Sequence, residues 1–274
     1  MSTEIYYFSG TGNSLHIAKE LQKRLPETEL IPMASLINKD GLETNAETVG
    51  FVFPIHFATI PMLVKDIIKK LDLNTTKYIF AVATRAGTPC STSFTKIDKI
   101  LKKKDKNLDS YLILNMANND SKFDNWHQIT DAELAELEAD VQTRLDSFQK
   151  RIIEKEKYQE KDTRITVPVN PVWVHLGSSM ADARGYSGED FYADTKCSGC
   201  GVCEKVCLSQ KIRMVDEKPE WQKKSPCFLC YACINYCPVQ SIQIKSKKYM
   251  KIYTEKNGRY HHPEATVNDI SGQK

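Results

Sequence analysis

The sequence predicts an α/β fold with a doubly wound parallel sheet, followed by a small α+β domain rich in cysteine. Three observations support this prediction. Short apolar runs alternate with amphipathic segments in the amino-terminal part, a glycine- and hydroxyl-rich turn follows the first apolar run, and eight of the nine cysteines lie between residues 197 and 237. Alternating strands and helices give a parallel sheet that is covered by helices on both faces.

Five strands are expected in this sheet. They are centred near Ile5, Leu30, Val49, Tyr78 and Tyr111. Amphipathic helices are expected between them, over residues 15–25, 62–71 and 94–101. A longer helix closes the unit, because Thr130 and Glu133 form a capping box and apolar residues then recur every three or four positions up to Ile152.

Composition narrows the function classes. The formal net charge of +3 is too small to indicate nucleic-acid binding, and 41% hydrophobic residues is typical of a globular protein. The most apolar stretch, residues 49–64, is interrupted by Pro54, His56 and Pro61 and is too short to span a bilayer. The polar start does not resemble a signal peptide. We therefore expect a cytoplasmic protein, in an anaerobic cell, with no membrane span.

The cysteines repeat one pattern twice. The two copies are Cys197-x2-Cys200-x2-Cys203-x3-Cys207 and Cys227-x2-Cys230-x2-Cys233-x3-Cys237-Pro238. This spacing lets three cysteines of one copy and the fourth cysteine of the other bind each cubane cluster. Structural zinc would leave four thiols without a role, and disulfides are typical of secreted chains. The pattern predicts two cross-ligated 4Fe-4S clusters.

Residues 188–245 resemble the bacterial two-cluster ferredoxins. On the cross-ligated scheme, one cluster is held by Cys197, Cys200, Cys203 and Cys237, and the other by Cys227, Cys230, Cys233 and Cys207. Leu208 stands where the first motif usually has proline, which should weaken the turn after Cys207. So short a domain is expected to depend on its metal for stability. Ile212, Val215, Ile242 and Ile244 are expected to pack around the clusters.

A candidate phosphate-binding loop follows the first strand. It consists of Ser9, Gly10, Thr11, Gly12, Asn13 and Ser14. Glycines let backbone amides approach an anion, hydroxyls add donors, and the amino end of the next helix adds a favourable dipole. A P-loop would need Gly-Lys-Ser/Thr, and a dinucleotide fingerprint would need a small residue where Leu15 stands. The neutral loop suits a terminal monophosphate.

Residues 4–155 resemble the flavodoxins, whose first loop binds the phosphate of FMN. The resemblance implies that two further loops hold the flavin ring, namely Pro54, Ile55, His56 and Phe57 after the third strand and Thr84, Arg85, Ala86 and Gly87 after the fourth. The alternative is a flavodoxin-like fold whose serine and glycine turn binds no flavin. Met116 and Asn118, after the fifth strand, are weaker candidates for lining the site.

Several side chains have two interpretations. His56 and Phe57 contact the flavin or are ordinary packed residues, and Arg85 faces the flavin or is a solvated loop arginine. Cys90 is expected to be a small buried side chain or an exposed thiol rather than a ligand. Ala58 does not adopt positive φ as cheaply as the glycine that many flavodoxins have there. Weak stabilisation of the flavin semiquinone is therefore expected.

The whole chain resembles the flavodoxin-ferredoxin fusions, an iron-sulfur flavoprotein family. The expected division is 1–162 for the FMN domain, 163–187 for a crossover, 188–246 for the cluster domain and 247–274 for a basic tail, the last expected to be solvated or disordered. The resemblance implies an electron-transfer flavoprotein with ferredoxin or an oxidoreductase as redox partner, in a monomer or homodimer. The alternatives are a ferredoxin-dependent reductase of a small substrate at the FMN and a redox sensor.

Overall fold

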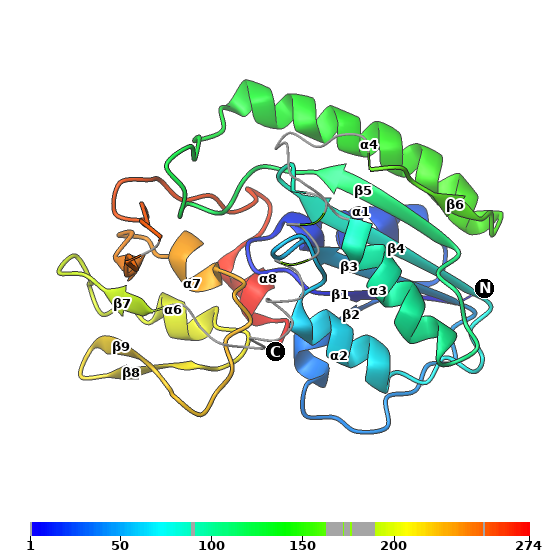
Figure 1. Ribbon diagram of the computed structural model, residues 1–274, viewed down its shortest axis with the longest axis horizontal. Helices are drawn as coiled ribbons and strands as arrows, with labels where there is room; N and C mark the ends of the chain where they lie inside the picture. The colour runs from blue at the N-terminus through cyan, green and yellow to red at the C-terminus, as the bar shows by residue number, and fades with distance from the viewer. Residues whose placement is uncertain (1, 89–90, 163–171, 173–175, 177–189, 249) are drawn as a thin grey trace.

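The computed structural model describes residues 2–88, 91–162, 172, 176, 190–248 and 250–274 (Figure 1). Cys90 lies outside the described residues. The predicted crossover, residues 163–187, also lies outside them, except for residues 172 and 176.

The central sheet contains six parallel strands in the order β2-β1-β3-β4-β5-β6. Their bounds are β1 Thr3–Tyr7, β2 Thr28–Pro32, β3 Thr48–Pro54, β4 Tyr78–Arg85, β5 Ser110–Asn115 and β6 Tyr158–Gln159. The prediction of five strands is wrong because it missed β6. A strand of two residues is too short to give a periodic pattern in the sequence. The order 2-1-3-4-5 is that of the flavodoxin-like doubly wound fold.

Helices cover both faces of this sheet (Figure 1). They are α1 Asn13–Arg24, α2 Met62–Lys70, α3 Ser91–Lys102 and α4 Asp131–Ile153. Helix α1 packs with α4 on one face, and α2 packs with α3 on the other. The capping box of Thr130 and Glu133 is present, as predicted. Among the described residues, no helix is both long enough and apolar enough to cross a membrane.

The cysteine-rich part consists of short elements. These are β7 Phe191–Ala193, α6 Val202–Lys205, β8 Ile212–Val215, β9 Lys218–Trp221, α7 Ala232–Asn235 and β10 Ile242–Ile244. Strands β7 and β10 pair antiparallel, and β8 and β9 form a hairpin. Ile212, Ile242 and Ile244 are buried with Cys203 in one apolar cluster, whereas Val215 is 41% exposed and is not part of this cluster.

The two cysteine motifs have the same backbone course. Positive φ angles occur at matching positions, which are Gly199 and Leu229, Gly201 and Tyr231, and Gln210 and Gln240. The turns after Cys207 and Cys237 are closed by equal hydrogen bonds of 3.0 Å, from Gln210 N to Cys207 O and from Gln240 N to Cys237 O. The leucine at position 208 therefore leaves the geometry of the first turn the same as that of the second.

The two parts of the molecule share one hydrophobic core. Leu208, Phe228 and Tyr236 from the cysteine-rich part are buried in the same cluster as the side chains of the large sheet. The ring of Phe228 meets the ring of Phe8 edge to face, with 6.1 Å between centroids. Leu208 therefore serves this core, which explains why an apolar residue stands at that position.

The carboxyl-terminal segment is ordered and packed, so the expectation of a solvated or disordered tail is wrong. It ends in the short helix α8, Val267–Ser271, which has its own capping box. Ile270 and Gln273 are completely buried. The expectation rested on the basic composition of the segment and did not consider buried residues such as Ile270 and Gln273, which pack it against the rest of the protein.

Candidate functional site

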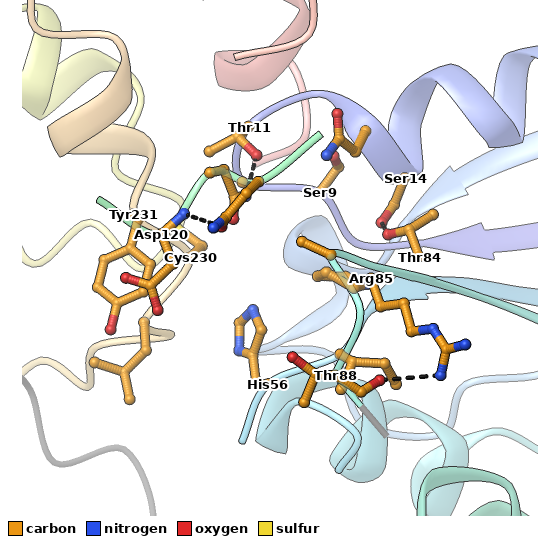
Figure 2. Close-up of a pocket in the computed structure, with 18 of the residues that line it drawn as sticks. Ser9, Thr11, Ser14, His56, Thr84, Arg85, Thr88, Asp120, Cys230 and Tyr231 are labelled. Carbon is orange, nitrogen blue, oxygen red and sulfur yellow. Dashed lines mark hydrogen bonds between the residues drawn. The ribbon is translucent and has the colours of Figure 1, made fainter. Parts of the chain in front are cut away.

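The carboxyl ends of β1, β3 and β4 open into a cavity of about 250 Å³ (Figure 2). Parallel strands of a doubly wound sheet commonly present ligand sites at this edge. Its lining includes all predicted site residues except Gly12 and Gly87, namely Ser9, Gly10, Thr11, Asn13, Ser14, Pro54, Ile55, His56, Phe57, Thr84, Arg85 and Ala86. Gly87 lines a neighbouring cavity together with Met116 and Asn118, and Asn118 reaches both.

Internal hydrogen bonds fix the candidate phosphate loop. The Ser9 hydroxyl accepts from Gly12 N at 3.1 Å, and the hydroxyls of Ser14 and Thr84 lie 2.8 Å apart. Thr11 Oγ1 accepts from the side-chain amide of Asn119 at 2.5 Å. Hydroxyls that already accept a bond keep a hydrogen to donate, so Ser9 and Thr11 can still serve an anion.

Asn13 provides a test of fit for FMN. Its Nδ2 donates to Ala117 O at 3.0 Å, but its buried Oδ1 has no hydrogen-bond partner among the described residues. A buried acceptor left unsatisfied costs about 1–3 kcal/mol. A ligand with hydroxyl donors beside a phosphate would satisfy it, and the ribityl phosphate chain of FMN has both groups.

The loop after β3 forms a tight two-residue turn at Phe57 and Ala58. His56 N donates to Thr59 O at 3.0 Å, Thr59 N donates to His56 O at 2.9 Å, and both central residues have positive φ, 49° and 59°. This is the signature of a type I′ turn. Ala58 therefore does adopt the angle that we expected to be unfavourable. The Thr92 hydroxyl donates to the Ala58 carbonyl oxygen and so holds this peptide in its present orientation. Weak stabilisation of the flavin semiquinone therefore remains a prediction.

His56 is half-buried in the cavity wall, and its ring meets the Phe8 ring in an edge-to-face arrangement with 6.1 Å between centroids. Burial, followed by the charge of Lys122, lowers the pKa of His56 to about 4. The imidazole is therefore neutral at pH 7. It can donate or accept one hydrogen bond without bringing charge into the cavity.

Arg85 is not a solvated loop residue. Its guanidinium is buried, forms an ion pair with Asp162 at 2.5 Å, and donates to Asn115 Oδ1 at 2.9 Å and to Thr88 O at 3.1 Å. Figure 2 shows the side chain extending away from His56 toward Thr88. Its charge is thus paired, and its visible role is to hold the loop after β4.

Lys122 is a cavity residue that the sequence reasoning missed. Its side chain is only 3% exposed, and its Nζ donates to the Tyr231 hydroxyl at 2.5 Å. Three aromatic rings surround the ammonium, those of Tyr231 at 4.7 Å, Phe57 at 5.4 Å and Phe123 at 5.6 Å. No periodic pattern includes residue 122, so only its position just beyond the end of β5 could have suggested it.

The eight cysteines form two groups of four around two small cavities. The outer set, as we call it, comprises Cys197, Cys200, Cys203 and Cys237, and the inner set comprises Cys207, Cys227, Cys230 and Cys233. These are the sets that the ferredoxin resemblance implies. Each contains three cysteines of one motif and the last cysteine of the other.

Four convergent thiols at each cavity are a donor set that suits a 4Fe-4S cluster. Burial raises the pKa of the Cys203 thiol to about 11 and that of Cys230 to about 12, so bound metal would have to displace their protons. Matching backbone amides donate to sulfur, Lys211 N to Cys207 Sγ and Ser241 N to Cys237 Sγ, both at 3.2 Å.

The inner set adjoins the cavity that the phosphate loop lines. Leu229, Cys230 and Tyr231 form part of the wall of this cavity. A side chain at Gly10 would place its Cβ 2.1 Å from the carbonyl oxygen of Cys230, so the two loops are in direct contact. By contrast, Cys200 of the outer set is exposed on the surface.

Neither a protein-family model nor a curated protein sequence matches the chain. Among solved structures, a candidate flavoprotein from Bacteroides uniformis overlaps 43% of this chain and 92% of its own, with 19% identity and a TM-score of 0.35. The Trp repressor binding protein from Bacillus subtilis overlaps 57% and 99%, with 11% identity and a TM-score of 0.34.

The rubredoxin oxygen:oxidoreductase from the anaerobe Desulfovibrio gigas overlaps 56% of this chain and 37% of its own, with 13% identity and a TM-score of 0.31. All three likenesses are weak and partial. The strand order described above, rather than these overlaps, identifies the fold of the sheet.

Proposed function

We propose that this protein is an electron-transfer flavoprotein that passes electrons between two 4Fe-4S clusters and an FMN. The clusters supply one-electron steps, and the flavin, when bound, supplies two-electron chemistry. The physiological partner is a redox protein such as a ferredoxin or an oxidoreductase.

One observation carries the proposal. The candidate phosphate loop and Cys230 of the inner set line the same cavity, and Gly10 lies directly against Cys230. Two redox groups held by these loops would be close enough for direct electron transfer within one chain. The exposed Cys200 puts the outer set on the side available to a partner protein. The proposed order is therefore partner, outer cluster, inner cluster and flavin.

The residues of the cavity have separate roles in this proposal. The loop from Ser9 to Ser14 holds the phosphate with neutral donors and the amino end of α1. His56 and Phe57 lie beside the ring, and Arg85 positions the loop after β4 through its ion pair with Asp162.

Anaerobic purification followed by iron, sulfide and flavin analysis tests the proposal. Two cluster sites and one phosphate loop predict about eight irons and one FMN per chain. Reduced external ferredoxin should then bleach the flavin absorbance rapidly. A well-folded preparation without iron and without flavin would refute the proposal.

A second candidate is a ferredoxin-dependent reductase that acts on a small substrate at the flavin. The polar wall of the cavity favours it, because the Lys122 ammonium, paired with Asp120 at 3.6 Å, and the neutral His56 can donate hydrogen bonds to a carbonyl-bearing group. Turnover with reduced ferredoxin and a panel of small acceptors separates the two candidates. A carrier equilibrates with ferredoxin and shows no specific acceptor, whereas a reductase saturates with one.

A further inference from the structure

The carboxyl-terminal segment reaches back to the candidate phosphate loop. The side-chain amide of Gln273 forms two hydrogen bonds with the backbone of Ser9, accepting from its N at 3.1 Å and donating to its O at 2.8 Å. Gln273 has no exposed surface. A buried glutamine thus satisfies both backbone groups of the first loop residue, which would otherwise need water or another ligand.

A second contact lies two residues further along the loop. His262 N donates to Thr11 O at 2.8 Å. Gly12 has φ of 97°, and a Cβ there would lie 2.4 Å from Ala265 Cβ and 2.8 Å from His262 Cβ. The segment therefore fills the space behind the loop, on the side away from the cavity, and Gly12 must remain a glycine for this fit.

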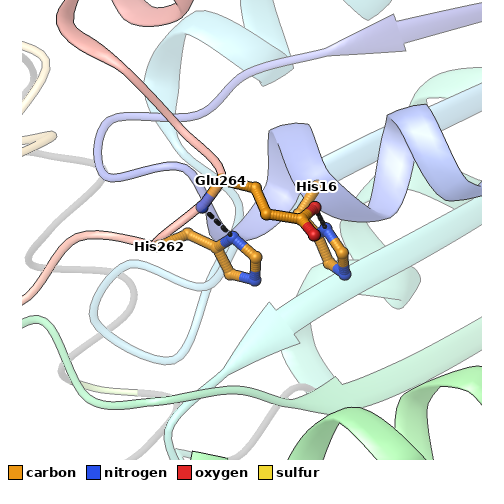
Figure 3. A group of neighbouring side chains, drawn as sticks. All are labelled: His16, His262 and Glu264. Atoms are coloured by element: carbon orange, nitrogen blue, oxygen red, sulfur yellow. Dashed lines mark hydrogen bonds and ion pairs between the residues drawn. The ribbon is translucent and has the colours of Figure 1, made fainter.

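Charged groups attach the same segment to the helices that follow the loop (Figure 3). His16 of α1 lies 3.0 Å from Glu264 of the segment through Nδ1 and 3.0 Å from Glu138 of α4 through Nε2. Lys19 of α1 bonds to Asp269 at 2.7 Å. Burial acts to lower the pKa of His16, but the bonds and charges of the two glutamates outweigh it, so the pKa is raised.

His16, His262 and Glu264 have ligand types that suit a metal ion, but their geometry does not. The imidazole rings of His16 and His262 are stacked, with 4.1 Å between centroids and 22° between planes. Nitrogen lone pairs lie in the ring plane, so nearly parallel stacked rings do not direct them to one point between them. Both nitrogens of His16 already face carboxylates. The group is an ion-pair attachment.

We propose that the carboxyl-terminal segment, residues 260–273, is a clamp that holds the phosphate loop in its FMN-binding shape, with Gln273 as the main positioning residue. This inference rests on the proposed function only in taking FMN as the ligand. Gln273 does not line the cavity, so it acts through Ser9 and not on the ligand itself.

A clamp on the phosphate loop and a general role of the segment in stability predict different effects on ligand binding. Its contacts converge on Ser9, Thr11 and Gly12, which belong to the phosphate end of the site and not to the ring end. Loss of the clamp should weaken ligands that carry the phosphate and leave ligands without it unaffected. Riboflavin, which is FMN without its phosphate, is the matching probe.

The test compares Gln273→Ala with wild type in the full-length, anaerobically prepared chain with its clusters. FMN and riboflavin affinities are measured separately by quenching of flavin fluorescence. Loss of two hydrogen bonds is expected to weaken FMN binding about tenfold or more. Riboflavin affinity should change less than twofold. Gln149→Ala, a half-buried glutamine of α4, is the matched control and should change neither affinity.

Gln273→Glu is a second variant for the case in which alanine leaves a destabilising hole. It keeps the volume and the acceptor for Ser9 N, removes the donor to Ser9 O, and adds a negative charge behind the loop. It should also weaken FMN selectively. Unchanged FMN affinity in both variants, or equal loss of FMN and riboflavin, would overturn the clamp. A wild-type protein that binds no flavin would instead overturn the proposed function, and the clamp with it.

Discussion

The two cysteine motifs share a backbone course but differ in their surroundings. Each motif has two left-handed positions between its cysteines. The first motif, Cys197 to Cys207, which we call the outer motif, has Gly199 and Gly201 there, whereas the second, Cys227 to Cys237, which we call the inner motif, has Leu229 and Tyr231. A residue other than glycine in this conformation costs about 1–3 kcal/mol. Leu229 and Tyr231 are also the residues that line the cavity beside the phosphate loop.

This difference shows how two copies of one motif can have different roles, one as a metal-binding turn alone and the other as a metal-binding turn that also forms a cavity wall. Where only a metal-binding turn is needed, glycine supplies the backbone angle at no steric cost. Where the turn must also form a cavity wall, side chains are retained despite the strain. Tyr231 additionally receives the hydrogen bond of Lys122. The strain therefore marks the inner motif as the one that faces the cavity lined by the candidate phosphate loop.

The largest expected effect comes from equivalent cysteines. Cys230→Ala and Cys200→Ala should each lose iron, but only Cys230→Ala should weaken FMN binding, by about tenfold or more. Without metal the inner loop loses the bonds that hold it against Gly10. Iron analysis and FMN titration of the two variants measure this. Equal FMN loss in both would contradict the distinction between inner and outer sets.

Removing a glycine from the first motif and adding one to the second should have opposite effects on cluster-domain stability. Gly201→Ala adds a Cβ with only Met214 Cγ nearby, at 4.0 Å, so it should cost about 1 kcal/mol of cluster-domain stability from backbone strain alone. Its FMN affinity should not change. Leu229→Gly should relieve similar strain and weaken FMN binding a few-fold, since it removes part of the wall. Denaturation monitored by cluster absorbance, with FMN titration, checks both.

Lys122 lies in the cavity wall and forms an ion pair with Asp120 at 3.6 Å. Its positive charge should favour the reduced, more negative forms of the proposed flavin and of the proposed inner cluster. Lys122→Met is expected to shift the reduction potential of the flavin, and to a lesser extent that of the inner cluster, to more negative values. Lys196→Met is the control, because Lys196 is largely exposed and lies next to Cys197 of the outer set. Potentiometric titration measures these shifts. A shift of equal size in the control would argue against a local effect.

The last prediction concerns the pH dependence of stability and not ligand binding. His56 has a pKa of about 4 when folded and about 6.5 when unfolded, so acidification from pH 6.5 toward 4 protonates mainly the unfolded chain and lowers the free energy of unfolding. Allowing for its partial exposure, the folded-to-unfolded ratio should fall about tenfold more in wild type than in His56→Gln between pH 7 and 5. Denaturant unfolding of wild type and His56→Gln at pH 7 and pH 5 measures this difference, and an equal change in both proteins would contradict the prediction.

Local patterns predicted most of the fold and the ligand groups. Strand and helix periodicity gave the first five strands and the long helix, and cysteine spacing with a family resemblance gave both sets of four thiols. Thr130 and Glu133 formed their capping box because such a signal involves only adjacent residues. These features depend on interactions over a few positions along the chain.

What sequence reasoning missed depends on contacts between distant residues. Lys122 becomes a cavity residue only because Tyr231, far along the chain, meets it. Gln273 lies in a segment whose lysines and polar residues are typical of a solvated end, and its partner Ser9 is 264 positions away. Arg85 was ambiguous for the same reason, since its partner Asp162 follows the whole of α4.

The bond between Ser9 and Gln273 has a consequence for biosynthesis. Amino-terminal domains commonly fold while the ribosome is still adding residues. Here the turn that begins after the first strand lacks part of its support until residue 273 has been translated and has left the exit tunnel. Coenzyme uptake should therefore follow the synthesis of residue 273, and ribosome-stalled chains truncated before α8 should emerge without yellow colour.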